Sequence, residues 1–318
     1  MADIISTEKT NIDLNIVNNI AKHHLFNLIE FCEKKYNLEL EVIANNILIS
    51  GKKFVLLAGP SSSGKTTTSK KLCEYLEKVH RPAVSISLDD FFMDRSTYTK
   101  LPDGTYDFET FDILDVKEFN KCIKELLEKH ETDLPEFDFI TGSRLEHRRH
   151  LTVTDANVII IEGIHALNPN LLQLDDSSLD YFYKLYVCVY SNFRIDDNSI
   201  IPAKLIRFMR RMLRDSQTRG IAVEETIREW DKVCAGEEKN IKPYRQYANY
   251  QLDTTHPYEP LLYHTYLEKI LEKNQNSEYG KELYTKLQKC GYLDESIVPD
   301  DSLLWEFLVK GKNTKELV

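Results

Sequence analysis

The chain has 318 residues, which suffices for one sizeable core with attachments or for two small domains. Its 51 acidic and 41 basic residues give a net charge of −10, so bulk charge argues against nucleic acid or an anionic membrane as a partner. The six cysteines form no C-x-x-C pair, no apolar run reaches the ~20 residues of a membrane helix, and Met1–Ile5 has no secretory pattern, so we expect a cytoplasmic protein with reduced thiols.

The first part of the chain predicts a helix followed by a strand–turn–helix unit. Residues 12–48 carry apolar side chains at helical spacing. The short apolar run at 54–58 is typical of a strand that is buried on both faces. A glycine-rich turn follows, then a helical stretch at 65–80 and a second strand at 83–88.

The second part of the chain continues this alternation. Asp115 and Glu118 form a capping box that opens a helix ending near residue 130. Apolar runs at 158–161 and 185–189 predict two more buried strands. Further helices are predicted at 196–217, 223–235 and 258–274. Strands that alternate with helices favour a parallel sheet covered on both faces, so we predict an α/β fold with ligands beyond the carboxyl ends of the strands.

A phosphate-binding loop is predicted at residues 59–66, where the sequence reads GPSSSGKT between a strand and a helix. Its glycines let several backbone amides point at one anion, and the helix N-terminus adds partial positive charge. Lys65 would reach the β- and γ-phosphates of ATP, and the Thr66 hydroxyl would ligate Mg²⁺. The alternative is a glycine–serine turn that binds no ligand.

Two carboxylates follow predicted strands at the same edge of the sheet. Glu162 ends the strand at 158–161, where an acidic residue would help to bind Mg²⁺ or its waters. Asp89 follows the second strand and could orient an acceptor hydroxyl and accept its proton, whereas we expect Asp90 to be structural. The alternatives are a strand-end acid that caps a turn, and aspartates that accept from backbone amides.

Arginines cluster on the helix predicted at 196–217. They are Arg207, Arg210, Arg211 and Arg214, at positions i, i+3, i+4 and i+7, with Arg219 shortly after the helix. Like charges at this spacing repel, so we expect the arginines to serve as a lid, at about 196–235, that neutralises a phosphoryl group and excludes water. The alternative is that the arginines lie on a solvated surface, where Asp215 relieves part of their mutual repulsion.

Taken in order, these segments resemble the uridine kinase/phosphoribulokinase family over roughly residues 53–255. The matching stretches are 59–67 (GPSSSGKTT), 87–92 (SLDDFF), 106–112 (YDFETFD), 135–144 (PEFDFITGSR), 158–167 (VIIIEGIHAL), 210–220 (RRMLRDSQTRG) and 240–250 (NIKPYRQYANY). The resemblance implies a P-loop NTPase-type parallel sheet with helices on both faces. It also implies ATP-dependent transfer of phosphate to a small-molecule hydroxyl, first of all the 5′-hydroxyl of a nucleoside.

The resemblance also implies roles for individual residues. Nucleotide contacts would come from Gly59, Ser61, Ser62, Ser63, Gly64, Lys65, Thr66, Thr67 and Arg211. The catalytic groups would be Asp89 as general base with Lys65, Arg214 and Arg219. Acceptor contacts would come from Asp107, Phe137, Phe139 and Arg144, with Asp107 on the ribose hydroxyls and Phe139 stacking on the base. Thr66 and Glu162 would serve the metal.

Some positions depart from the pattern. Phe137 and Gly142 stand where uridine–cytidine kinases carry a tyrosine and a histidine that read the pyrimidine edge, so another sugar or polyol stays open as the acceptor. A catalytically weak nucleotide-binding switch is a further alternative. The chain is also similar to a bacterial-type nucleoside kinase subgroup that often has a threonyl-tRNA-synthetase-like N-terminal region, which suggests RNA association as a third alternative.

The expected organisation is therefore tripartite. Residues 1–50 form a helical N-terminal extension, in which we expect no synthetase-like region because only about 50 residues precede the loop. Residues 51–255 form the kinase domain, and 256–318 form a helical extension used for packing or for contacts in a homo-oligomer. We expect no nucleic-acid partner and no membrane partner.

Overall fold

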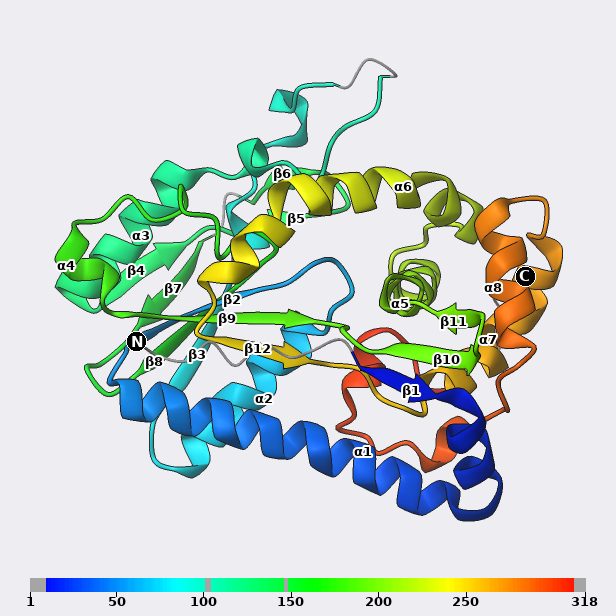
Figure 1. The fold of residues 1–318 in the computed structure, drawn as a ribbon. Helices are drawn as coiled ribbons and strands as arrows, with labels where there is room; N and C mark the ends of the chain where they lie inside the picture. Colours follow the sequence, from blue (N-terminus) through cyan, green and yellow to red (C-terminus); the bar gives the residue numbers. More distant parts are fainter. Residues whose placement is uncertain (1–9, 101–103, 146–147, 312–318) are drawn as a thin grey trace.

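The computed structural model describes residues 10–100, 104–145 and 148–311 (Figure 1). Met1–Ile5, where we expect no secretory signal, lies outside this part. Among the described residues, no helix combines the length and the apolar character that crossing a membrane requires.

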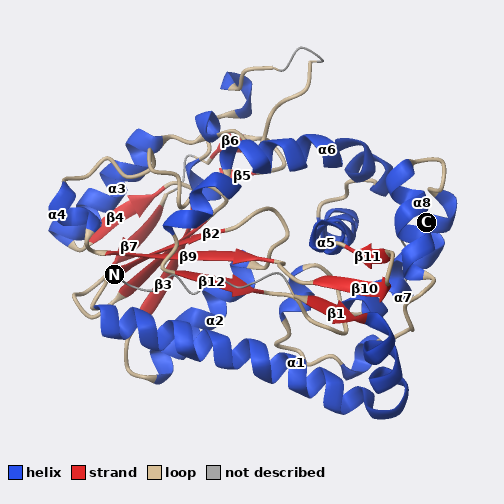
Figure 2. Cartoon of the chain, in the orientation of Figure 1, coloured by secondary structure: helices blue, strands red, loops and turns tan. Residues whose placement is uncertain are grey.

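A parallel sheet of five strands forms the centre of the protein (Figures 1 and 2). In spatial order its strands are β12 (Tyr250–Asp253), β9 (Phe182–Cys188), β2 (Phe54–Ala58), β8 (Val158–Glu162) and β3 (Ala83–Ser87). The chain passes from β2 to β3, returns to β8 and then crosses to β9 on the other side of β2. The strand order therefore reverses beside β2, which is where α/β sheets bind ligands. The predicted fold class is confirmed.

Helices cover both faces of this sheet. Val55 and Leu57 of β2 pack in one core with α1 (Leu14–Ser50) and α2 (Lys65–Lys78). Phe54 and Leu56 point to the opposite core, which includes α3 (Val116–Lys129). Because side chains alternate along a strand, the continuous apolar run of β2 supplies both cores.

A second group of elements adjoins the carboxyl end of the sheet (Figure 1). Its small sheet is made of β1 (Asn11–Asp13), β10 (Asn192–Asp196) and β11 (Ser199–Ile201). Its helices are α5 (Ala203–Thr218), α6 (Val223–Asn240), α7 (Glu259–Lys273) and α8 (Glu278–Leu287).

Our prediction of a helix from residue 196 is wrong, because α5 begins only at Ala203 and strands precede it. Phe193 and Ile195 are buried whereas Arg194 and Asp196 are exposed, which is the period of a strand.

A short helix and two hairpins lie on the α3 side of the sheet (Figure 1). They are α4 (Asp176–Leu179) and the two hairpins β4–β7 (Glu131–Leu134 with Arg149–Thr152) and β5–β6 (Phe137–Asp138 with Ser143–Arg144).

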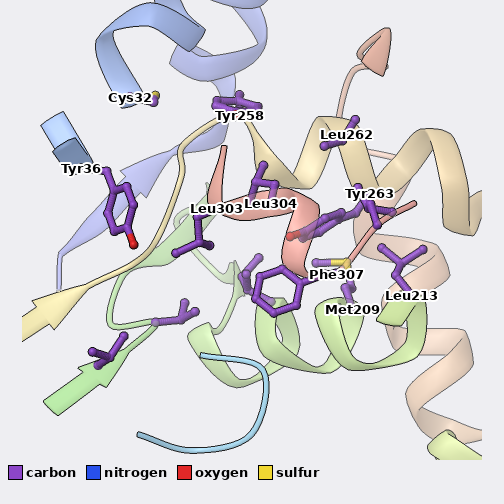
Figure 3. Close-up of a cluster of buried hydrophobic side chains, with 14 of the residues drawn as sticks. Cys32, Tyr36, Met209, Leu213, Tyr258, Leu262, Tyr263, Leu303, Leu304 and Phe307 are labelled. Carbon is purple, nitrogen blue, oxygen red and sulfur yellow. The ribbon is translucent and has the colours of Figure 1, made fainter. Parts of the chain in front are cut away.

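The C-terminal segment returns to the middle of the protein. After α8, the short turn η6 (Leu303–Glu306) lies between α7 and α5 (Figure 3). Leu303, Leu304 and Phe307 are buried there in the same core as Tyr258 and Met209. The tail is therefore part of the fold beside the phosphate-binding loop.

Candidate active site

The predicted phosphate-binding loop joins β2 to α2, and protein donors bind its carbonyls. Arg207 Nη1 donates to the Ser61 carbonyl at 2.9 Å, and Thr254 Oγ1 donates to the Ser63 carbonyl at 2.7 Å. Because these carbonyls are directed outward, the loop's amides are left to face a common anion. Ser62 adopts a left-handed conformation with φ of 58°, which lets the backbone curl in this way.

Two glycines of the loop are required by their surroundings. A Cβ at Gly59 would lie 2.0 Å from the backbone oxygen of Val187 on β9. A Cβ at Gly64 would lie 2.6 Å from Leu303 Cδ1, and the φ of Gly64 is +91°. Larger residues would therefore displace the loop from the sheet or from the C-terminal segment.

Two of the clustered arginines are structural. Arg207 Nη1 and Nη2 each donate to the Glu237 carboxylate at 2.5 Å, and Arg210 Nε donates to Glu259 at 2.8 Å. The Arg207 and Arg210 side chains are fully buried, so they belong neither to a solvated surface nor to a lid that meets ligand. Our interpretation of the arginines as one ligand-facing surface is therefore wrong for these two, which instead bind the loop to α6 and α7.

The other three arginines surround the buried carboxylate of Asp215. Arg211 lies 3.2 Å, Arg214 2.8 Å and Arg219 3.7 Å from Asp215 oxygens. Arg211 also donates to the Ser61 hydroxyl at 2.9 Å, which places it at the loop. Asp215 and the Glu109 carboxylate, 3.8 Å from Arg211, cannot together neutralise three guanidinium groups, so this cluster offers net positive charge to an anion at the loop.

Glu162 lies beside the hydroxyls expected near a magnesium ion. Its Oε1 accepts from Thr66 Oγ1 and from Ser87 Oγ, both at 3.4 Å. Burial raises the pKa of the Glu162 carboxyl to about 7, with Asp89 and Glu306 adding to the rise and Lys65 opposing it.

Ser87 was not among the predicted site residues. Its signal was present in the sequence, because it ends β3 directly beside Glu162 at the end of β8, and the two residues pair in register.

These residues fit Mg²⁺ bound together with a nucleotide. Within the described ranges, no three His, Cys, Asp or Glu side chains cluster as a metal site of their own. Magnesium at phosphate sites uses one or two protein oxygens as ligands and takes the other ligands from phosphate and water. The hydroxyl of Thr66 and the carboxylate of Glu162 can supply the protein oxygens. The pKa of Glu162 is raised because its carboxylate is buried, and a bound cation would stabilise the charge of that carboxylate.

Asp89 lies within electrostatic reach of the expected phosphate-binding cations. Burial raises the pKa of its carboxyl, and Lys65, Arg219 and Arg214 oppose that rise. Lys65 Nζ itself donates to the Pro60 carbonyl at 3.2 Å, at the mouth of the loop. The structure thus brings together the candidate base, the loop lysine and two candidate lid arginines.

The expected acceptor residues lie in two places. Phe137 is 8% exposed and packs edge-on against Phe92 and Phe139, while Phe139 is 52% exposed and could stack on a ligand. Asp107 accepts from the amide of Glu109 at 2.9 Å.

Arg144 has protein partners for its guanidinium. It donates to the Phe91 and Phe92 carbonyls at 3.1 and 2.9 Å and to Asp115 at 3.0 Å. Through these contacts Arg144 ties the segment after Asp89 to the start of α3, and its contact with an acceptor stays a prediction.

Two further residues near the acceptor side escaped sequence reasoning. Glu109 is buried, its Oε1 lies 3.8 Å from Arg211, and burial raises the pKa of its carboxyl to about 7. The Arg95 side chain lies within 2.9 Å of the Cβ position of Gly142, so an arginine fills the space where a side chain at 142 would be. Arg95 belongs to none of the matching stretches, and Glu109 lies within 106–112 but carries no role there in the sequence prediction.

Comparison with known proteins shows the family of the chain. The profile of the Phosphoribulokinase / Uridine kinase family matches residues 54–256. The chain is 29% identical over 201 residues to a uridine kinase of Saccharomyces cerevisiae, covering 61% of this chain and 35% of that protein. It is 28% identical over 209 residues to a uridine kinase of Borrelia duttonii, covering 62% of this chain and 84% of that protein.

Solved structures include similar chains as well. A possible uridine kinase from Bacillus stearothermophilus has 18% identity and a TM-score of 0.44, covering 67% of this chain and 97% of that chain.

The chain spans between 21% and 35% of the length of the first four curated relatives that it matches.

Proposed function

Since the chain belongs to the phosphoribulokinase/uridine kinase family, we propose that it transfers the γ-phosphoryl group of ATP to a hydroxyl of a small molecule. The observation that carries the proposal is the position of Asp89, a partly buried carboxylate within electrostatic reach of Lys65, Arg214 and Arg219. A general base beside phosphate-neutralising cations is what phosphoryl transfer to an alcohol requires.

Each residue has a role in this reaction. The amides of 59–66 bind the triphosphate, and Lys65 with Arg214 and Arg219 neutralises charge on the transferred group. Asp89 orients the acceptor hydroxyl and accepts its proton as the oxygen attacks phosphorus in line. Magnesium, bound by Thr66 with Glu162, would neutralise charge between the phosphates.

The acceptor that we propose first is the 5′-hydroxyl of a nucleoside. Phe139 is exposed enough to stack on a base, and Asp107 can accept from ribose hydroxyls. The nearest alternative is another sugar or polyol, which is favoured by the absence of hydrogen-bonding side chains at Phe137 and Gly142.

The remaining proposals concern organisation. We propose that Arg211, Arg214 and Arg219 belong to a lid, at about 196–235, of the kinase domain that covers 51–255, and that the protein works in the cytoplasm. The terminal extensions would then support the domain or contact a second copy.

An ADP-release screen tests the function. Nucleosides, sugars and polyols are offered with ATP–Mg²⁺ to the wild type, to Asp89→Asn and to Asp112→Asn, a control in an exposed carboxylate of the neighbouring loop. We expect at least one acceptor to stimulate ADP release in the wild type and in the control but not in Asp89→Asn. Slow hydrolysis that no hydroxyl compound stimulates would favour the nucleotide-binding switch instead.

A further inference from the structure

The C-terminal turn η6 supplies a carboxylate to the start of the phosphate-binding helix. In α2 the first amide bonded within the helix is that of Thr68, which donates to Gly64 at 3.0 Å. The preceding amide of Thr67 donates instead to Glu306 Oε2 at 2.8 Å, although the two residues are 239 positions apart. The anion at this helix end is therefore a side chain of the protein itself.

The Thr67 amide belongs to the same anion site as the loop. Lys65 and Thr66 occupy the two preceding positions of α2, and a helix N-terminus attracts phosphate through its free amides and its dipole. The charge of Glu306 is also felt across the site, because it contributes to the raised pKa of Glu162. A donor phosphate on the Thr67 amide would meet this carboxylate at short range.

The segment that carries Glu306 is anchored on both sides. Ser302 Oγ donates to the buried Glu33 of α1 at 2.6 Å, and Leu303 packs against Gly64. On the other side, the ring of Phe307 lies 4.8 Å from the guanidinium carbon of Arg210 (Figure 3 shows Leu303 and Phe307). Glu306 is only partly buried between these neighbours, so its side chain can turn away while the turn stays in place.

We propose that Glu306 is a residue of the donor-nucleotide site, where its carboxylate occupies the Thr67 amide until a donor phosphate replaces it. One N–H group cannot serve two anions, and the like charges repel, so Glu306 weakens nucleotide binding and its side chain moves when nucleotide binds. This inference rests on the proposed function, and it concerns a segment outside the stretch 54–256 that matches the family.

The test compares the affinity of charge-changing variants for ATP–Mg²⁺ by calorimetry. Glu306→Gln keeps an oxygen that accepts from the Thr67 amide, so the fold and its melting temperature stay close to the wild type. We expect this variant to bind ATP–Mg²⁺ about tenfold more tightly, the size expected for one charge at a partly buried helix terminus. Asp300→Asn removes an exposed carboxylate from the same segment, where it pairs with Lys310, and should leave the affinity unchanged.

Tryptophan fluorescence gives a second readout, because Trp305 precedes Glu306 and the chain has only 2 tryptophans. The Trp305 indole donates to the Pro299 carbonyl at 2.6 Å. ATP–Mg²⁺ should change the emission of the wild type, the change should be absent in Trp305→Phe, and Glu306→Gln should reduce it.

The outcomes separate this inference from the proposed function. If the wild type binds ATP–Mg²⁺ and Glu306→Gln binds it equally or more weakly, the role of Glu306 is wrong and the kinase proposal stands. The role is also wrong if Asp300→Asn tightens binding as much, because the effect is then one of net charge. Binding by Glu306→Gln alone supports the inference, and failure of both proteins to bind ATP–Mg²⁺ overturns both proposals.

Discussion

Replacing Arg207 by methionine should separate the stability of the fold from the shape of the phosphate-binding loop. Arg207 makes two 2.5 Å hydrogen bonds to Glu237 and one of 2.9 Å to the Ser61 carbonyl. The side chains of Arg207 and Glu237 are 3% and 0% exposed, so the substitution leaves a carboxylate buried without its partner. Removing one member of such a pair costs about 3–5 kcal/mol, out of a total stability of about 5–15 kcal/mol.

Urea denaturation measures the first effect, and calorimetry with ATP–Mg²⁺ on the folded fraction measures the second. The double variant Arg207→Met/Glu237→Leu removes both charges and should recover the free energy of unfolding to within about 2 kcal/mol of the wild type. It should not recover nucleotide affinity, because the Ser61 carbonyl still lacks its donor. Arg228→Met, at an exposed arginine beside Glu229, is the matched control and should change stability by no more than about 0.5 kcal/mol.

Two results would refute this reasoning. If Arg207→Met lowers the free energy of unfolding by less than about 1 kcal/mol, the unpaired Glu237 carboxylate does not destabilise the folded protein as argued. Full ATP–Mg²⁺ affinity in the double variant would mean that the loop keeps its shape without Arg207.

Three further changes test other parts of the site. Asp89→Asn should lower kcat by about 10²–10⁴-fold while calorimetry finds the same ATP–Mg²⁺ affinity, and an unchanged kcat would remove Asp89 as the base. Gly59→Ala should cost at least about 1–3 kcal/mol in urea denaturation and abolish nucleotide binding, since its Cβ would lie 2.0 Å from the Val187 oxygen. Gly291→Ala, with its nearest contact at 3.5 Å, should do neither, and equal losses in the two variants would contradict the steric argument. Folding raises the pKa of Glu162 from 4.5 to about 7, so between these two pH values the folded protein holds a proton that the unfolded protein has lost. The free energy of unfolding should therefore fall by up to about 3 kcal/mol as the pH rises from 4.5 to about 7. Glu162→Gln should flatten that part of a pH series of urea denaturation curves, and an unaltered slope would show that this carboxyl does not titrate there.

The catalytic edge could be predicted from the sequence because its signals are local. The loop at 59–66 is recognised from its sequence motif and from the strand before it. Asp89 and Glu162 each follow an apolar run. Parallel strands end at one edge of the sheet, so these residues had to meet once the strands were recognised. Ser87 could have been found by the same argument, because it ends the strand beside Glu162.

What the sequence could not specify are partners that lie far apart in the chain. Arg207 and Arg211 share one helix face by spacing, yet the first pairs with Glu237 in the core and the second reaches the loop. Helical periodicity gives the direction of a side chain and not the element that packs against it. The strand β12 was missed because Tyr250–Asp253 is short and includes polar residues, and its place in the sheet is set by pairing with β9.

The supports of the phosphate-binding loop set an order of events during synthesis. The donors to the Ser61 and Ser63 carbonyls, Arg207 and Thr254, lie 146 and 191 positions later in the chain. A nascent chain emerging from the ribosome therefore contains the loop long before it contains the groups that shape it. Nucleotide stabilises only a conformation that can bind it, so ATP cannot assist the early stages of folding and can rescue only chains completed beyond β12.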